Sequence, residues 1–146
     1  MEGASDTVAI GIQLGASALL VTVMALVHGL GLVAISRLLG LNADQLEERP
    51  FDWRGAMLMG GIALMLFVLH MVEIGLFAGF YLGVGALGDV EEALHYSASA
   101  YATLGQAGEY PTYEWRLVGA IESLIGFLLI GWSTAFIVSK VDKLRS

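Results

Sequence analysis

Two glycines and a carboxylate stand close together in the segment Thr103-Leu104-Gly105-Gln106-Ala107-Gly108-Glu109. Glycine adopts backbone angles that other residues resist, so carbonyl groups along this segment can turn towards a common axis. Carbonyl oxygens held in that way can replace the water around a cation, and the Glu109 carboxylate could add a ligand for a divalent ion. The segment therefore predicts cation coordination. One chain supplies one such strand, so a ring of ligands requires several copies with cyclic symmetry.

The chain that carries this segment is too apolar for a water-soluble protein. Its 146 residues are 57% hydrophobic and only 14% charged, against about 25% charged in soluble domains. Three apolar runs, at 8–36, 56–87 and 117–139, are each long enough for a helix to cross a bilayer. The first run is too long for a cleaved signal peptide and follows acidic rather than basic residues. We therefore predict an all-α membrane protein with three transmembrane helices.

Basic residues indicate how these helices are oriented. Six of the seven basic residues lie in or beside the loop after the first run (Arg37, Arg49 and Arg54) or follow the last run (Lys140, Lys143 and Arg145). The exception is Arg116. The positive-inside rule then places the 37–54 loop and the C-terminus in the cytoplasm and the N-terminus outside. It follows that the segment 88–115 must begin and end on the outer side.

Within that segment, residues 90–104 are moderately apolar but too few to cross a membrane. A helix of this length covers roughly two-thirds of the hydrocarbon core. Asp89 is a good N-cap, and Glu92 completes a capping-box-like pair. We predict a re-entrant helix whose negative C-terminal end points at mid-membrane and favours a cation. The chain then returns as 103–109, which requires this backbone to be buried in protein or to line a water-filled path.

From about residue 66 to residue 141 the chain resembles the pore domain of the potassium-channel superfamily, in which a pore helix and a filter lie between two membrane helices. Residues 103–109 nearly match the potassium filter pattern Thr-x-Gly-Tyr-Gly-Asp. Gly108-Glu109-Tyr110-Pro111 resembles the end of a potassium filter and its exit. Trp115-Arg116-Leu117 resembles the start of the pore-lining helix. Residues 131–136 resemble its inner half in small bacterial members.

This resemblance implies roles for particular residues. It implies four subunits around one pore, gating hinges at Gly126 and Gly131, and filter support from Glu122 and Tyr101. Glu122 is expected to reach hydroxyls or amides of the pore helix. The implied selectivity filter consists of Thr103, Leu104, Gly105, Gln106, Ala107, Gly108 and Glu109.

The filter departs from the family pattern at two positions. Gln106 replaces the tyrosine that braces the carbonyl strand, and Ala107 adds a residue between the glycines. We therefore expect weak or no selectivity among cations, with K⁺, Na⁺ and also Ca²⁺ as candidate ions. A potassium-selective channel and a non-conducting scaffold or accessory subunit are the alternatives. Glu109 either faces the axis as a metal ligand or packs behind the filter, and both remain open.

The resemblance also divides the chain and places it in a membrane. Residues 1–55 form an additional transmembrane helix and a cytoplasmic loop, and 56–146 form the pore domain. The implied protein is a homotetramer in a lipid bilayer, the bacterial inner (plasma) membrane, with cations as its ligands. We expect no cofactor and no nucleic-acid partner. We expect no enzyme activity, because the ionisable residues of the apolar runs form no recognisable catalytic set.

Other polar residues and glycines within the apolar runs carry further expectations. His70 and Glu73 share a helix face and could bind a metal with a third ligand, but a hydrogen bond to a neighbouring helix is the simpler expectation. His28 is expected to be interfacial or bonded to a neighbour, and His95 to be exposed. The glycine stripe Gly75, Gly79 and Gly83 predicts close packing against the first or the pore-lining helix.

Overall fold

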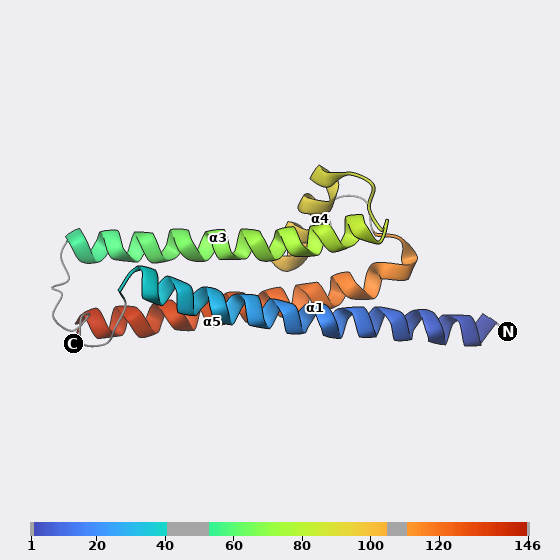
Figure 1. Cartoon of the computed structure of the whole chain (residues 1–146), viewed down its shortest axis with the longest axis horizontal. Coiled ribbons are helices and arrows are strands. Elements are labelled where there is room, and N and C mark those ends of the chain that lie inside the picture. The colour runs from blue at the N-terminus through green and yellow to red at the C-terminus, as the bar shows by residue number, and fades with distance from the viewer. Residues whose placement is uncertain (1, 41–52, 105–110, 146) are drawn as a thin grey trace.

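The computed structural model describes residues 2–40, 53–104 and 111–145, and these are mainly helical. Three long helices, α1 (Glu2–Leu38), α3 (Trp53–Gly83) and α5 (Arg116–Arg145), lie side by side. A short helix, α4 (Val90–Tyr101), and a 3₁₀ turn, η1 (Tyr113–Trp115), lie towards one end of the bundle (Figure 1). α1 and α5 run in one direction and α3 runs in the other.

The three long helices match the three predicted membrane spans. Ala9–Leu38, Trp53–Gly83 and Arg116–Asp142 are each long and apolar enough to cross a membrane. The second helix ends earlier than the apolar run suggested, at Gly83 rather than at residue 87. The reason is a turn in which Gly85 adopts a positive φ of 68°, a conformation that favours glycine. The Ala86 N–H then donates to the Tyr81 carbonyl oxygen at 2.8 Å.

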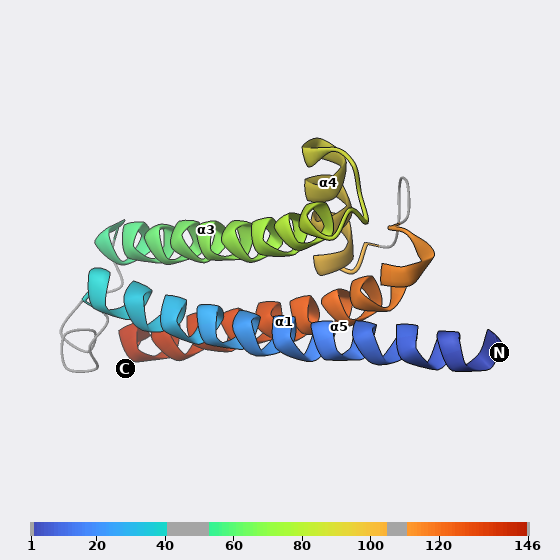
Figure 2. The same ribbon diagram turned by 45° about the vertical axis from the view of Figure 1, so that its right-hand side comes forward.

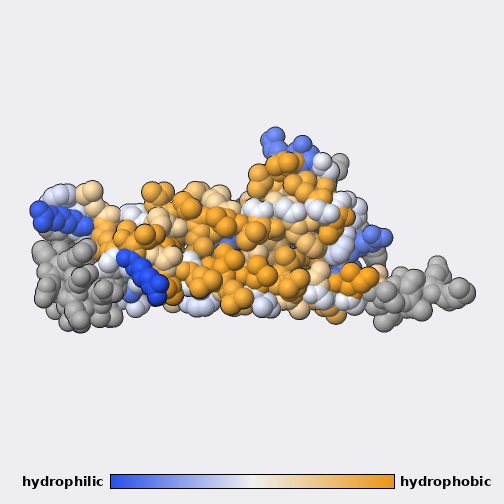
Figure 3. Space-filling view, in the orientation of Figure 1, coloured by the Kyte–Doolittle hydropathy of each residue, from blue (hydrophilic) through white to orange (hydrophobic). Residues whose placement is uncertain are grey.

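The described helices bury several polar side chains and expose many large apolar ones. On α1, Leu26 and Leu30 are 61% and 69% exposed, whereas His28 between them is fully buried. Glu73 on α3 and Glu122 on α5 are also fully buried. Figure 3 shows an apolar surface along the long helices, with hydrophilic residues mostly towards the ends. This arrangement suits a lipid environment, in which polar groups must find partners inside the protein.

α4 crosses the direction of the long helices steeply (Figure 2). Its predicted N-cap is confirmed, because the Asp89 carboxylate accepts from the backbone N–H groups of Glu91 at 2.8 Å and Glu92 at 3.2 Å. The helix ends at Tyr101, three residues earlier than the predicted 90–104. Thr103 ends it by adopting the left-handed conformation, with φ 56°.

The segment that contains α4 leaves and returns to the same end of the bundle. The Thr112 N–H donates to the Ala86 carbonyl oxygen at 3.3 Å, which joins the chain after α4 to the chain before it. Nearby, the rings of Phe80 and Trp115 meet nearly at right angles, with centroids 5.2 Å apart. The two ends of the segment are therefore neighbours at one end of the bundle, and the prediction that this end lies outside the membrane stays a prediction.

Two contacts at different levels along the bundle join α1 to α5 and to α3. The Gln13 side-chain oxygen accepts from the backbone N–H of Leu117 at 2.9 Å, so α1 caps the first turn of α5. Deeper in the bundle, α1 contacts α3 at Gly31, where an added Cβ would be 2.5 Å from the Leu69 side chain. These contacts hold α1 against the helices that support α4.

Candidate functional site

Two glycines of α5 allow α4 to approach it closely. A Cβ on Gly119 would lie 1.9 Å from the Tyr96 hydroxyl, and a Cβ on Gly126 would lie 2.3 Å from the Tyr101 carbonyl oxygen. Gly126 accepts no side chain unless the backbone of α4 moves, and Gly119 accepts none unless the Tyr96 side chain shifts. The two contacts therefore fix the C-terminal half of α4 on the surface of α5.

A buried carboxylate ties α4 to both neighbouring helices. Glu122 on α5 accepts from the Tyr81 hydroxyl of α3 at 2.7 Å and from the Ser97 hydroxyl of α4. The Ser97 oxygen also lies 3.0 Å from the Ile74 carbonyl oxygen of α3. The three side chains in this network are fully buried. Glu122 thus reaches a hydroxyl of the short helix, as expected, and a role in supporting a filter stays a prediction.

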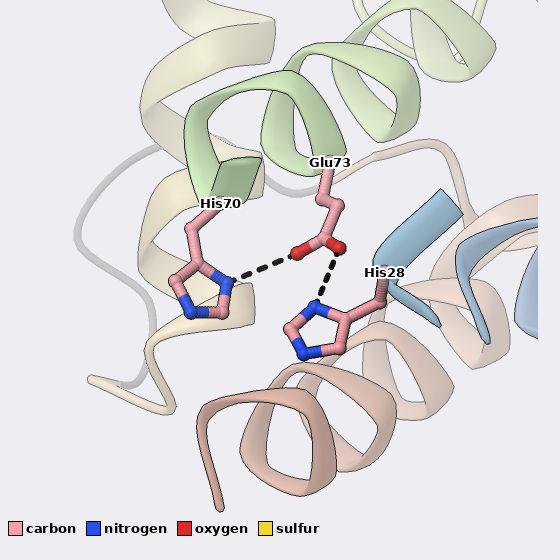
Figure 4. Close-up of side chains that lie close together, drawn as sticks. All are labelled: His28, His70 and Glu73. Carbon is pink, nitrogen blue, oxygen red and sulfur yellow. Dashed lines mark hydrogen bonds and ion pairs between the residues drawn. The ribbon is translucent and has the colours of Figure 1, made fainter. Parts of the chain in front are cut away.

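A second buried carboxylate lies deeper in the bundle, between two histidines (Figure 4). Nδ1 of His28 on α1 is 2.9 Å from one Glu73 oxygen, and Nδ1 of His70 on α3 is 3.0 Å from the other. His28 and Glu73 have no exposed side-chain surface, and His70 is 17% exposed. One ligand atom from each of the three residues can be chosen so that all lie within 4.8 Å of one another.

Residues of the remaining two helices complete this cluster. The Tyr101 hydroxyl of α4 donates to Glu73 and lies 2.8 Å from His70 Nδ1. Burial, together with the neighbouring Glu73 carboxylate, raises the pKa of Tyr101, so the phenol keeps its proton. Ser133 Oγ of α5 lies 3.0 Å from Nε2 of His70 and 3.4 Å from Nε2 of His28. The cluster therefore joins α1, α3, α4 and α5.

The sequence predicted the hydrogen bonds of this cluster but not all of its members. His70 and Glu73 do bond to neighbouring helices, as expected, and His28 is bonded to a neighbour rather than interfacial. The association of His28 with Glu73 was missed. A usable signal lies in α1, where the polar residues Gln13, Ser17 and His28 are all buried on one side of an otherwise apolar helix.

The described structure reaches only the start of the predicted filter. Thr103 and Leu104 follow α4 after Ala102, and Leu104 is 79% exposed. The other predicted filter residues, from Gly105 to Glu109, lie outside the described residues, and with them the predicted cation ligand Glu109. Their role in ion coordination stays a prediction.

The glycines singled out in the sequence have different surroundings. Gly126, predicted as a hinge, packs against the Tyr101 backbone, whereas a Cβ on Gly131 would meet nothing within 4 Å. Bending at either residue stays a prediction. The expectation that the glycine stripe of α3 packs against α1 or α5 is wrong for a single chain: a Cβ would meet nothing within 4 Å at Gly75, Gly79 or Gly83. The stripe faces away from both helices.

The described polar clusters are thus a buried hydrogen-bonded Glu122 and a buried His–Glu–His group, both in contact with α4. Both are suited to holding α4 in place or to binding a cation. No family model, curated protein or solved structure matches this chain.

Proposed function

We propose that the chain assembles into a homotetrameric cation channel in which α4 is the pore helix and residues 103–109 form the filter. One observation carries the proposal: the C-terminal end of α4 lies deep against the long helices. Tyr101 is bonded to Glu73, which lies about 15 Å inside the end of α3 at Gly83. The segment nevertheless returns to the end from which it left, where Thr112 bonds to Ala86.

The charges on α4 support a cation path. Its first turn carries Glu91 and Glu92, and its last turn carries no basic residue. The negative end of the helix dipole is the C-terminal end, at Tyr101, next to the start of the proposed filter. In an assembly, the same end of α4 from each subunit would face the common axis and lower the energy of a cation there.

The contacts that anchor α4 support a structural role for its C-terminal end. Glu122, Glu73 and two α5 glycines hold the helix at its middle and at its end. An ion filter needs this rigidity, because backbone carbonyls must stay aimed at the ion. The exposed glycine stripe of α3 offers a surface on which a neighbouring subunit can pack closely. We propose weak selectivity among monovalent cations, because Gln106 and Ala107 alter the filter.

A cysteine introduced at the filter entrance tests the proposal directly. The natural chain contains no cysteine, so Leu104→Cys gives a single reactive thiol. Purified Leu104→Cys protein in liposomes should pass K⁺ and Na⁺, and a charged, membrane-impermeant thiol reagent should reduce that flux at least about ten-fold. The matched control is Leu19→Cys, which places a thiol at another exposed apolar position, 66% exposed on α1. Its flux should not change.

Three outcomes separate the alternatives. Wild-type liposomes that pass no cation contradict the channel and favour a scaffold or accessory subunit. Flux that is equally insensitive to thiol reagent in both variants contradicts the placement of the filter. Reversal potentials that show a strong preference for K⁺ over Na⁺ support the potassium-selective alternative.

A further inference from the structure

The geometry points to a binding site for a divalent transition-metal ion, formed by His28, His70 and Glu73. Two imidazoles and one carboxylate are a ligand set that suits Zn²⁺ and related ions, and hard ions such as Mg²⁺ prefer oxygen. The three residues come from α1 and α3, and their ligand atoms converge within 4.8 Å. This site does not depend on the proposed pore.

The two nitrogen–oxygen distances in the cluster are close to ligand spacings in a metal centre. The two imidazole Nδ1 atoms lie 2.9 Å and 3.0 Å from separate oxygens of the Glu73 carboxylate. A tetrahedral Zn²⁺ ion with bonds of about 2.0–2.1 Å holds neighbouring ligand atoms roughly 3.3 Å apart. A small outward shift of the two rings therefore makes room for an ion between the Nδ1 atoms and the carboxylate.

The hydrogen-bond partners of the two imidazoles suit an ion at this position. Nδ1 of each ring faces the Glu73 carboxylate, and Nε2 of each ring faces the Ser133 hydroxyl. With a metal on the Nδ1 atoms, both Nε2 atoms carry protons. The Ser133 oxygen has two lone pairs and accepts both.

The surroundings also resemble the outer shell of a metal site. The groups paired with the fully buried Glu73 are His28, His70 and Tyr101, none of which carries a permanent charge. A divalent cation would offset the buried carboxylate. Tyr101 and Ser133 would orient the ligands, as second hydrogen-bond partners commonly do around metals. The His70 side chain is 17% exposed, so the cluster reaches the surface of the single chain there.

Zinc binding to the purified full-length protein tests the site without any flux measurement. The protein, with any histidine tag removed, is titrated with Zn²⁺ in detergent by calorimetry, and the visible spectrum of bound Co²⁺ reports nitrogen and oxygen coordination. The wild type should bind one Zn²⁺ per chain. His70→Ala and Glu73→Gln should each weaken binding at least about ten-fold. His95→Ala is the matched control: it removes the remaining histidine of three, which is exposed on α4, and should bind as the wild type does.

A wild type that does not bind one Zn²⁺ per chain would overturn the proposal. The cluster would then be a hydrogen-bonded group only. Binding that both cluster variants retain, or that His95→Ala abolishes, would also overturn it. Glu73→Gln preserves the size of the side chain, and thermal unfolding of each variant checks that it is folded. Because binding is read without ion flux, this site and the channel proposal fail separately.

Discussion

Gly126 of α5 lies against the backbone of Tyr101, so closely that a Cβ would be 2.3 Å from the Tyr101 carbonyl oxygen. Tyr101 is the last residue of α4 and precedes the predicted filter by one residue, Ala102. The contact is with backbone, which cannot rotate away as a flexible side chain could. Gly126 therefore sets the distance between α5 and the end of α4.

We predict that Gly126→Ala destabilises the protein by about 1–3 kcal/mol, the usual cost of adding a methyl group to a filled site. Thermal unfolding of the purified protein in detergent measures this change. Gly131→Ala is the control, because a Cβ there would meet nothing within 4 Å. In a helix that substitution should be neutral or stabilise by up to about 1 kcal/mol. Equal effects at the two positions would contradict the contact.

The bonds of Glu122 give a second prediction. Tyr81→Phe and Ser97→Ala each remove one donor to the buried carboxylate and should each cost about 1–3 kcal/mol of stability. Because both donors share Glu122, the double variant should depart from additivity by about 0.5–3 kcal/mol. Unfolding in denaturing detergent measures all three variants.

Ser123→Ala is the control for the Ser97 substitution. Among the described residues, its hydroxyl bonds to the Gly119 carbonyl one turn earlier on the same helix, at 3.1 Å. Its loss should leave the α4 contacts intact and change stability little. Additive effects of Tyr81→Phe and Ser97→Ala would show that Glu122 does not couple α3 to α4.

The elements of this fold could be predicted because local rules determine them. The lengths of the apolar runs indicated the three long helices. Asp89 indicated the start of α4, because an N-cap side chain bonds only to backbone N–H groups of the next few residues. The end of α4 was placed three residues late because a single left-handed residue, Thr103, ends it. Nothing in a threonine signals that conformation.

The partners of the buried polar residues could not be predicted in the same way. His28 and Glu73 are 45 positions apart and meet only because α1 and α3 pack at that depth. The residue types of His28 and Glu73 indicated that each needs a hydrogen-bond partner, but they did not indicate which residue that partner is. The glycine stripe of α3 shows the same limit: its spacing indicated close packing, and among the described residues nothing lies within 4 Å of a Cβ on any of its three glycines.

That outward-facing stripe gives a third prediction. Gly79→Ile adds a side chain where nothing lies within 4 Å in one chain, so the subunit should still fold. If a neighbouring subunit of the proposed tetramer packs there, that tetramer should dissociate at concentrations at least about ten-fold higher, equivalent to about 1.4 kcal/mol. Native mass spectrometry or light scattering measures this. Gly60→Ile on the same helix, also in open space, should leave the tetramer intact. An unchanged tetramer in both variants would place the interface elsewhere.

The cap that α1 provides to α5 gives a fourth prediction. Gln13→Leu removes the acceptor for the Leu117 N–H and should cost about 0.5–2 kcal/mol, as loss of an N-cap does. Gln13→Glu keeps the acceptor and adds a negative charge near the positive end of α5, so it should retain the wild-type stability or exceed it. Thermal unfolding separates the two. Similar losses in both variants would indicate that side-chain shape, rather than the hydrogen bond, matters at this position.

The proposed filter gives a final prediction, about selectivity. Replacing Gln106 with tyrosine and deleting Ala107 restores the sequence Thr-Leu-Gly-Tyr-Gly-Glu. By the family resemblance, the tyrosine braces the carbonyl strand and the shorter loop restores the carbonyl register. Reversal potentials in mixed K⁺ and Na⁺ should then show K⁺ selectivity at least about ten-fold above the wild type, a difference of about 1.4 kcal/mol. Gln106→Tyr alone should gain less, because the extra residue still separates the glycines. A wild type that already excludes Na⁺, or a restored filter that gains nothing, would contradict the proposal that Gln106 and Ala107 weaken selectivity.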